Sequence, residues 1–335
     1  MRRVLIPNNL QSLPPQLPVG EVRTITGWSM GTTWTVHYID ATQRPVATVS
    51  ALVEEALDLV VAQMSTWQVD SNLSLFNAAP ANTWHRLPSA CFEVLDCALK
   101  VAADTKGAFD PTVGAVVNLW GFGPHGQRTV PPDMTEVQAM RANTGYQKLQ
   151  LDKANQRILQ TGGVYIDFSG IAKGYSVDLI ADALSAAGIE NFLVEVGGEL
   201  FGAGIKSDGQ PWWVALETSL VVTGLTESIV ALHGLAIATS GDYQRYFEYQ
   251  GRHYSHTIDP RTGFPIDDAS NPLVSVSVTH AKCMMADALA TALTVMGTQA
   301  ALAYAEQHNV AVRLVEQTDD GYQEFFSSEF RAMLE

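Results

Sequence analysis

The amino-acid sequence predicts an α+β fold with antiparallel strands, not a doubly wound parallel sheet. The expected helices fall in separate groups, whereas a parallel α/β fold alternates strands and helices regularly. A hairpin is expected over 243–249 and 252–258, around the Gln250-Gly251 turn. Apolar residues make up 47% of the 335 residues and charged residues 16%, so the chain can build a sizeable core.

The N-terminal part of the chain begins with an extended segment and continues with strands and a helix. Several prolines predict an extended strap over 1–20. Strand-like residues follow over 22–40 and are interrupted at Ser29-Met30-Gly31. A helix is expected to begin at Ser50, because apolar residues then recur on one helical face at Val53, Leu57, Val60 and Met64.

The middle of the chain holds a second helix, a long loop and a strand–helix pair. The second helix is expected from about Ser89 to Gly107. Residues 121–133 are rich in glycine and proline, which predicts a loop that acts as a boundary or a lid. A strand is expected over 163–168, followed by a helix over 170–187 that ends at Gly188.

The remaining elements are mostly strands. Helices are expected over 282–296, where Gly297 ends the helix, and over about 299–308. Strands are expected over 192–203, 212–217, 228–232, 235–239, 273–279, 310–315 and 322–327.

The charge balance restricts the possible partners. The chain has 20 Lys and Arg residues against 35 Asp and Glu residues, a net charge of −15. Such a protein repels nucleic-acid phosphates and anionic lipid surfaces, so neither is an expected partner.

No apolar run is long enough for a membrane span, and no signal peptide is visible. The cytoplasm is the expected location, with the periplasm as the alternative if an export segment is missing.

Sequence signatures of several common cofactor sites are absent. Cys91, Cys97 and Cys283 are an odd number of cysteines without CxxC spacing, which predicts buried thiols and no disulfide or zinc site. Gly202-Ala203-Gly204 begins a dinucleotide-binding pattern, but Ser207 stands at the third glycine position. The sequence contains no GxxxxGK[ST], GxSxG or HExxH motif.

The helix expected over 282–296 contains a carboxylate among apolar residues. Asp287 and Thr291 are four residues apart, so their side chains lie on one face, one turn apart. Together they can bind a hard cation such as Mg²⁺. Alternatively, Asp287 caps the helix and Thr291 bonds to a backbone carbonyl of its own helix. An ionised Asp in apolar surroundings is costly unless it is paired, which favours the functional interpretation.

Residues 167–174, DFSGIAKG, form a strand end, a tight turn and the start of a helix. Backbone amides at such a helix start can face an anion. Lys173 lies in the first helical turn, where the helix dipole disfavours a cation, and a bound phosphate would explain its position. The alternative is a solvated lysine on an ordinary turn.

Two further segments contain candidate site residues. In SHTIDPRTG, His256 precedes an Asp-Pro turn and is a candidate general base; alternatively it is a hydrogen-bonded histidine beside a turn that Asp259 organises. In GAFDPTVG, Phe109 and Asp110 can seat a planar ring, and the alternative is turn chemistry alone. Close backbone approach to a ligand is also possible at the turns Gly197-Gly198 and Ser240-Gly241-Asp242-Tyr243.

Taken together, in this order, these segments resemble the ApbE family, the FAD:protein FMN transferases. Each motif is weak alone, but seven of them in register over most of the chain, from about Met30 to about Gly297, are a strong match. Beside the segments above, the matching residues are Met64-Ser65-Thr66-Trp67 with Asp70-Ser71 and Ser74, VEVGGE, ATSGDY and ADALAT.

The resemblance implies a single ApbE-type, T-fold-like domain over 21–335, with antiparallel sheets, flanking helices and FAD in a cleft. It also implies Mg²⁺-dependent transfer of the FMN half of FAD to a Thr or Ser hydroxyl of a target protein, with release of AMP. His256 matches the family's proposed base, and Asp287 is expected to serve catalysis as a metal ligand. The other metal positions are Thr291, a carbonyl near Gly170, and Ala290 close by. The implied FAD contacts are Met30, Trp67, Ala108, Phe109, Asp110, Asp167, Lys173 and Ile258.

The sequence departs from the family pattern at two positions. Trp67 stands where many relatives have Tyr, which keeps ring stacking but loses a phenolic hydrogen bond. Ala290 stands where some relatives have Asp, so one possible metal ligand is missing. The family's acceptor pattern, D-x-x-[ST]-G-A-T, does not occur in this sequence, so the expected acceptor is another protein. The alternative functions are a metal-dependent FAD pyrophosphatase that forms FMN and AMP, and a non-catalytic FAD-binding protein.

Overall fold

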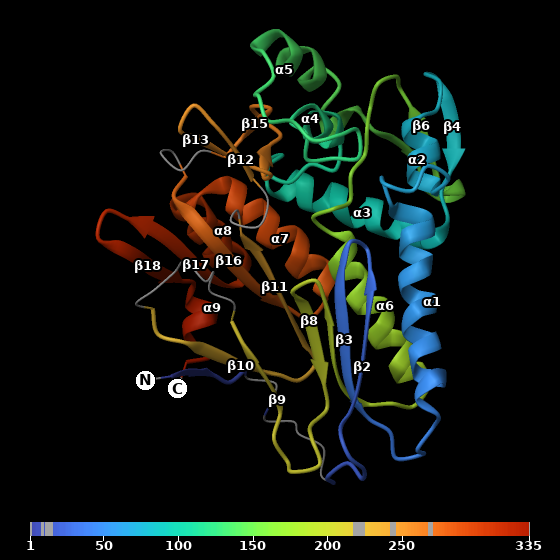
Figure 1. The fold of residues 1–335 in the computed structure, drawn as a ribbon, viewed down its shortest axis with the longest axis vertical. Helices are drawn as coiled ribbons and strands as arrows, with labels where there is room; N and C mark the ends of the chain where they lie inside the picture. Colours follow the sequence, from blue (N-terminus) through green and yellow to red (C-terminus); the bar gives the residue numbers. More distant parts are fainter. Residues whose placement is uncertain are drawn as a thin grey trace.

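An antiparallel sheet forms the centre of the computed structural model, which describes residues 2–7, 10, 16–216, 225–241, 246–266 and 271–334 (Figure 1). Within these residues the sheet has eight strands in the order β18-β17-β16-β11-β8-β7-β3-β2, and every neighbouring pair is antiparallel. The fold class is therefore α+β, as predicted. The strands are β2 (Arg23–Ser29), β3 (Thr32–Ile39), β7 (Asn191–Val196), β8 (Glu199–Ala203), β11 (Leu235–Gly241), β16 (Leu273–His280), β17 (Ala311–Thr318) and β18 (Gly321–Phe326).

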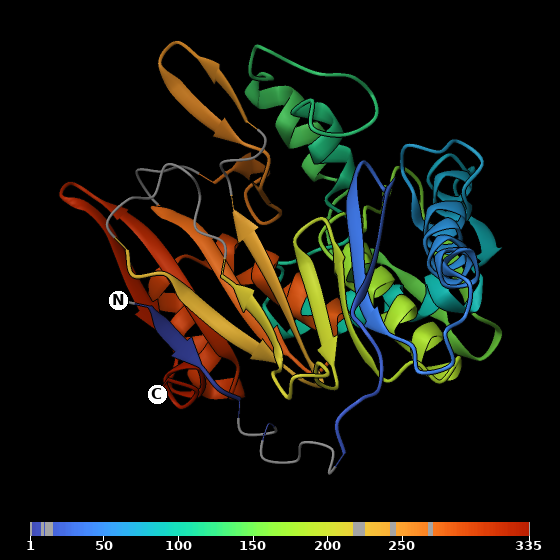
Figure 2. The same ribbon diagram turned by 60° about the horizontal axis from the view of Figure 1, so that its bottom comes forward.

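Helices cover one face of this sheet, and a smaller sheet packs on the other face (Figure 2). The smaller sheet has the order β1-β10-β9, with β1 (Arg3–Leu5) parallel to β10 (Ser228–Leu232) and β9 (Trp212–Ala215) antiparallel to it. Burial of apolar side chains between these layers is the main stabilising contribution to the fold. The helices are α1 (Val46–Met64), α3 (Ser89–Asp104), α6 (Ala172–Ala186), α7 (Cys283–Met296) and α8 (Thr298–His308).

Short elements connect these layers, and the sequence patterns were too brief to predict most of them. The short helices are α2 (Asn72–Asn77), α4 (Gly114–Leu119), α5 (Met134–Arg141), α9 (Ser328–Arg331), and the 3₁₀ turns Tyr146–Lys148 and Lys153–Asn155. The short strands are β4 (Thr83–Arg86), β5 (Gln150–Asp152), β6 (Arg157–Gln160), β12 (Tyr246–Tyr249), β13 (Arg252–Ser255), β14 (Ile258–Asp259) and β15 (Phe264–Pro265).

Three sequence predictions were wrong, each for a local reason. The single strand expected over 192–203 is two antiparallel strands, β7 and β8, because Gly197 and Gly198 make a turn between them with φ values of +60° and +96°. Helix α1 begins at Val46 and not at Ser50, because Pro45 directly precedes the first turn with a φ of −55°, which suits a helix start. Residues 163–168 form no strand beyond an isolated parallel bridge between Tyr165 and Val113. Their backbone groups bond elsewhere: Ile166 exchanges two hydrogen bonds with the side-chain amide of Asn77, at 2.9 and 2.8 Å, and the N–H of Asp167 donates to Pro111.

The predicted N-terminal strap includes a strand that pairs with the body of the protein. β1 pairs with β10, and Leu5 is fully buried. The guanidinium of Arg3 donates to both carboxylate oxygens of Glu324, at 3.0 and 2.9 Å, and its Cζ lies 4.8 Å from the ring centroid of Phe326. These contacts fix the strap against β18. The proposed domain limit at residue 20 stays a prediction.

Some predicted features lie wholly or partly outside the described residues: Pro14, Pro15, residue 217 of the strand over 212–217, residues 243–245 of the hairpin, and Asp242-Tyr243 of ATSGDY. The described part of that hairpin is confirmed, since β12 pairs with β13.

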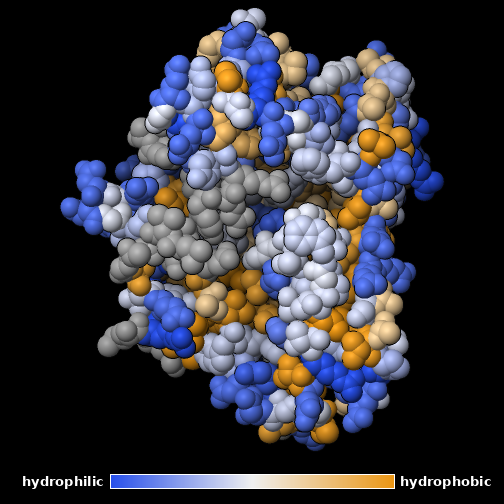
Figure 3. Space-filling view, viewed as in Figure 1, coloured by the Kyte–Doolittle hydropathy of each residue, from blue (hydrophilic) through white to orange (hydrophobic). Residues whose placement is uncertain are grey.

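The three cysteines are buried and free, as predicted. No helix among the described residues is long and apolar enough to cross a membrane. Hydrophilic side chains cover much of the face shown in Figure 3.

Candidate active site

A cavity of about 850 Å³ lies between the helical layer, the end of the β2–β3 hairpin and the segment around β14. Its size is within the range of small-molecule sites. Most of the predicted site residues line it, although they come from segments more than 250 residues apart in the sequence. They are Met30, Trp67, Ala108, Phe109, Asp110, Asp167, Gly170, Lys173, His256, Ile258, Asp287 and Thr291.

Close packing of helices α6 and α7 brings the cavity's ionisable groups together. A Cβ atom at Gly174 would lie 2.4 Å from the carbonyl oxygen of Cys283, so only glycine allows this approach. The N–H of Gly174 donates to Oδ2 of Asp287 at 2.9 Å. Asp178 on α6 accepts from the N–H groups of Cys283 and Met284, at 2.9 and 3.0 Å, and so satisfies the first turn of α7.

Asp287 and Thr291 lie one turn apart on α7 and both face the cavity. Neither structural alternative for them holds. α7 begins at Cys283, so Asp287 does not cap it, and the Thr291 hydroxyl has no hydrogen-bond partner among the described residues. A Cβ atom at Gly170 would lie 2.9 Å from Oγ1 of Thr291, which places the 169–170 turn directly against this hydroxyl.

The donor set fits a hard cation. It combines one carboxylate, one hydroxyl and a nearby backbone turn, and oxygen ligands of this kind suit Mg²⁺. Burial raises the pKa of Asp287 more than Lys173 and the Gly174 N–H lower it, so a second cation would favour the ionised form. Among the described residues, no three His, Cys, Asp or Glu side chains lie together as a metal-binding group.

Lys173 is paired inside the protein. Its Nζ lies 2.7 and 2.8 Å from the two carboxylate oxygens of Glu199 and donates to the carbonyl of Gly197 at 3.3 Å. Burial alone would lower the pKa of Lys173, but Glu199 and Asp287 together raise it. Burial also raises the pKa of Glu199, to about 8, against the opposite effect of Lys173. The two-pronged contact at these distances is that of an ion pair.

Apolar and aromatic side chains line other parts of the cavity. Phe109 and Ile258 are buried, whereas Trp67 is 62% exposed and lies where a ring could stack on it from solvent. Met30 has a φ of +53° and Gly31 a φ of +74°, which together make the two-residue turn between β2 and β3. A methionine in the left-handed region is strained, and such strain is often kept at functional sites.

The two predicted aspartates of the loops also organise the backbone around them. Asp110 accepts hydrogen bonds from the N–H and the hydroxyl of Thr112, at 2.8 and 2.6 Å, and from the N–H of Tyr146 at 2.8 Å. Asp167 accepts from the N–H of Ser169 at 2.7 Å. Turn chemistry therefore accounts for part of each motif, while both residues still line the cavity.

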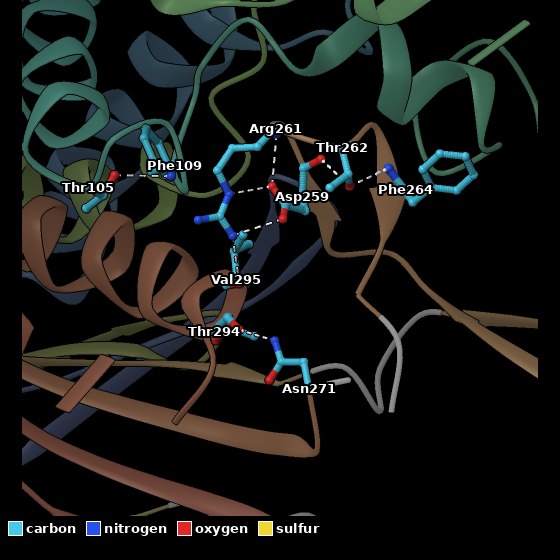
Figure 4. Close-up of polar contacts among 9 residues, drawn as sticks. All are labelled: Thr105, Phe109, Asp259, Arg261, Thr262, Phe264, Asn271, Thr294 and Val295. Carbon is cyan, nitrogen blue, oxygen red and sulfur yellow. Dashed lines mark hydrogen bonds and ion pairs between the residues drawn. The ribbon is translucent and has the colours of Figure 1, made fainter. Parts of the chain in front are cut away.

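His256 lies between β13 and β14 at the cavity wall. Its ring meets Phe122 edge-on, with centroids 6.4 Å apart. The following segment is held in place by Arg261, which binds both oxygens of Asp259 at 2.9 Å and the carbonyl of Val295 on α7 at 3.3 Å (Figure 4). Through Arg261 the segment that bears His256 is fixed to the helix that bears Asp287.

The structure does not bring Ala290 to the cavity. Its methyl group is 1% exposed, and its carbonyl accepts a hydrogen bond from Thr294 at 2.8 Å. The metal role predicted for this position gains no support from the geometry. Several lining residues were missed from the sequence, among them Phe122 and Glu199. Glu199 directly follows the Gly197-Gly198 turn, where close backbone approach was expected, and this was the available signal.

A second cavity of about 610 Å³ lies on the other side of the β14 segment and contains none of the predicted site residues. The chemistry is therefore concentrated in the larger cavity. A buried carboxylate, a hydroxyl, a lysine, aromatic side chains and a histidine around one cavity make this cavity the candidate active site.

Comparison with known proteins identifies the family. The ApbE family model matches residues 30–314, and the chain belongs to the ApbE family. The FAD:protein FMN transferase of Vibrio cholerae is 42% identical over 313 residues, covering 92% of each chain. That of Haemophilus influenzae is 37% identical over 325 residues, covering 94% of this chain and 92% of the relative. The apo structure of Pseudomonas stutzeri flavinyl transferase ApbE superposes with a TM-score of 0.86 at 38% identity, covering 93% of this chain and 96% of that one.

Proposed function

We propose that this chain is an FAD:protein FMN transferase that moves the FMN half of FAD to a Thr or Ser hydroxyl of another protein and releases AMP. The observation that carries the proposal is that Asp287, Thr291, Lys173 and His256 line the same cavity. The names of the similar proteins support the same activity.

The reaction exchanges one phosphorus–oxygen bond for another. The acceptor hydroxyl attacks the phosphorus of the FMN half, the bond from that phosphorus to the bridging oxygen of the pyrophosphate breaks, and AMP leaves with that oxygen. His256 takes the hydroxyl proton, because an alcohol is a poor nucleophile at neutral pH. Met30, Trp67, Ala108, Phe109, Asp110, Asp167, Lys173 and Ile258 are the proposed FAD contacts.

Asp287, Thr291 and the carbonyl of Gly170 are the residues that would hold Mg²⁺. When bound there, Mg²⁺ supplies positive charge that stabilises the pyrophosphate of FAD during phosphoryl transfer. The protein itself offers little such charge at this point, because Glu199 already neutralises Lys173. A bound cation would therefore supply the positive charge that a protein with a net charge of −15 lacks for an anionic substrate.

The direct test mixes the purified protein, FAD, Mg²⁺ and a small acceptor protein with a D-x-x-[ST]-G-A-T segment. We expect a fluorescent acceptor whose intact mass rises by one FMN unit, and no change with EDTA or with an acceptor whose Thr or Ser is replaced by alanine. Free FMN and AMP beside an unmodified acceptor would indicate a pyrophosphatase instead. FAD that stays whole under all conditions would indicate a binding protein. The cytoplasmic location, with the periplasm as its alternative, stays a prediction.

Replacing Met30 by glycine allows the backbone strain at this position and the contact of its side chain with FAD to be measured separately. Glycine accepts the positive φ of this turn without steric cost, but the change also removes the packing of the Met30 side chain against the core, so the free energy of unfolding is expected to stay within about 1 kcal/mol of its original value. The same change removes a side chain that lines the cavity, and FAD affinity should fall by about tenfold. Thermal unfolding and FAD fluorescence titration measure the two effects. An FAD affinity equal to that of the unchanged protein would contradict a contact between Met30 and FAD.

A further inference from the structure

In the mechanism above the carboxylate of Glu199 does no more than neutralise Lys173, although it is buried at the wall of the active-site cavity. Glu199 is the first residue of β8 and is 2% exposed. Both of its oxygens contact Nζ of Lys173, and no other side chain among the described residues donates to them. A buried carboxylate is costly to keep ionised, and a structural partner alone is a weak reason to retain one.

The turn before β8 is built to bring this carboxylate to Lys173. Gly197 has a φ of +60°, and a Cβ atom at this position would lie 3.3 Å from Cδ of Lys173 and 2.7 Å from Cγ2 of Thr32. The carbonyl of Gly197 also accepts from Nζ. An ammonium group has three N–H donors, and here three protein oxygens surround it. Lys173 is thereby held against the turn.

Asp287 is the other carboxylate whose charge acts on Lys173 in this part of the cavity, although it makes no direct ion pair with the lysine. Lys173 precedes Gly174, whose N–H contacts Asp287, and the negative charge of Asp287 acts on the lysine. A buried ammonium that lost Glu199 would be unpaired, which is strongly unfavourable. Its flexible four-carbon stem allows it to turn to the nearest remaining carboxylate. That carboxylate is Asp287, and a direct ion pair there would engage the carboxylate that is proposed to bind the cation.

We propose that Glu199 is a positioning residue: by holding the ammonium group of Lys173, it prevents a Lys173–Asp287 ion pair and leaves Asp287 available to a divalent cation. This inference rests on the proposed function, because it takes Asp287 as a metal ligand. If the proposal holds, Glu199 favours metal binding because it keeps Lys173 away from Asp287, in addition to any effect of its own negative charge.

The experiment titrates the metal-free full-length chain with Mn²⁺, without FAD, and follows free Mn²⁺ by electron paramagnetic resonance. In Glu199→Gln we expect Mn²⁺ to bind roughly tenfold more weakly, because the released lysine competes for Asp287. In the double variant Lys173→Met/Glu199→Gln the competitor is absent, and binding should return to within about threefold of the unchanged protein. Thermal unfolding of each variant checks that it is folded.

Glu195→Gln is the matched control. It removes the same charge from the other side of the same turn, but Glu195 accepts from the N–H of Gly198, whereas the oxygens around Nζ of Lys173 are those of Glu199 and Gly197. We expect its effect on Mn²⁺ binding to be about twofold or less. Equal Mn²⁺ affinity in Glu199→Gln and the unchanged protein would overturn the positioning role, as would a double variant as weak as Glu199→Gln. Both results leave the proposed metal site intact, whereas an unchanged protein that binds no Mn²⁺ would overturn the site and the positioning role together.

Discussion

Replacing His256 by alanine is expected to lower the rate of FMN transfer by about 10²- to 10⁴-fold, the usual contribution of a general base. FAD affinity should change little, because the other proposed FAD contacts stay in place around the cavity. The effect therefore falls on kcat and not on KM for FAD. The pH profile should also change, since the variant loses the rise in rate that reports deprotonation of the base.

The measurement is single-turnover transfer to the acceptor protein, followed by intact mass, together with an FAD titration of both proteins. His125→Ala is the control, because His125 is an exposed histidine of the neighbouring loop and lies outside both cavities. A His256→Ala variant that transfers FMN at an unchanged rate would exclude His256 as the base. A variant that binds FAD much more weakly but keeps kcat would instead assign His256 to substrate binding.

Local sequence patterns predicted the parts of the fold that depend on neighbours in the chain. The apolar spacing of residues 89–104 predicted α3, and the four-residue separation of Asp287 and Thr291 placed both on one face of α7. Local patterns did not predict the structure of segments whose hydrogen-bond partners are distant in the sequence. Residues 163–168 have the composition of a strand, but their hydrogen bonds go to the side chain of Asn77 and to Pro111.

The site residues were predicted from motifs in register, and the structure adds how they depend on one another. The motif VEVGGE predicts no role for Glu199, because its partner Lys173 is 26 residues earlier on another element. Gly174 also looked like an ordinary helix residue, although the contact of α6 with α7 requires it to have no side chain. Such relations depend on which faces of α6, α7 and β8 meet, and the local pattern of a segment does not contain that information.

Replacing Asp287 by asparagine is expected to lower Mg²⁺-dependent transfer by about 10³-fold or more, because a bound cation contributes several kcal/mol to such reactions. Asparagine has nearly the same shape and its oxygen can still accept from the N–H of Gly174. The loss is therefore expected to come from metal binding and not from a changed fold. Asp182→Asn is the matched control, because its side chain is 72% exposed on the same helix as Lys173.

The same substitution should stabilise the metal-free protein at neutral pH. Burial raises the pKa of Asp287 above its ordinary value of 3.8. A carboxyl whose pKa is raised in the folded state stabilises the fold fully below pH 3.8, and this contribution is lost as the pH rises through the raised pKa. Asparagine does not titrate, so in EDTA the stability of Asp287→Asn relative to the unchanged protein should increase between pH 4 and pH 7. Thermal unfolding at the two pH values measures this difference. A variant that loses activity and is also less stable at pH 7 in EDTA would contradict the view that Asp287 is retained for the cation at the expense of stability.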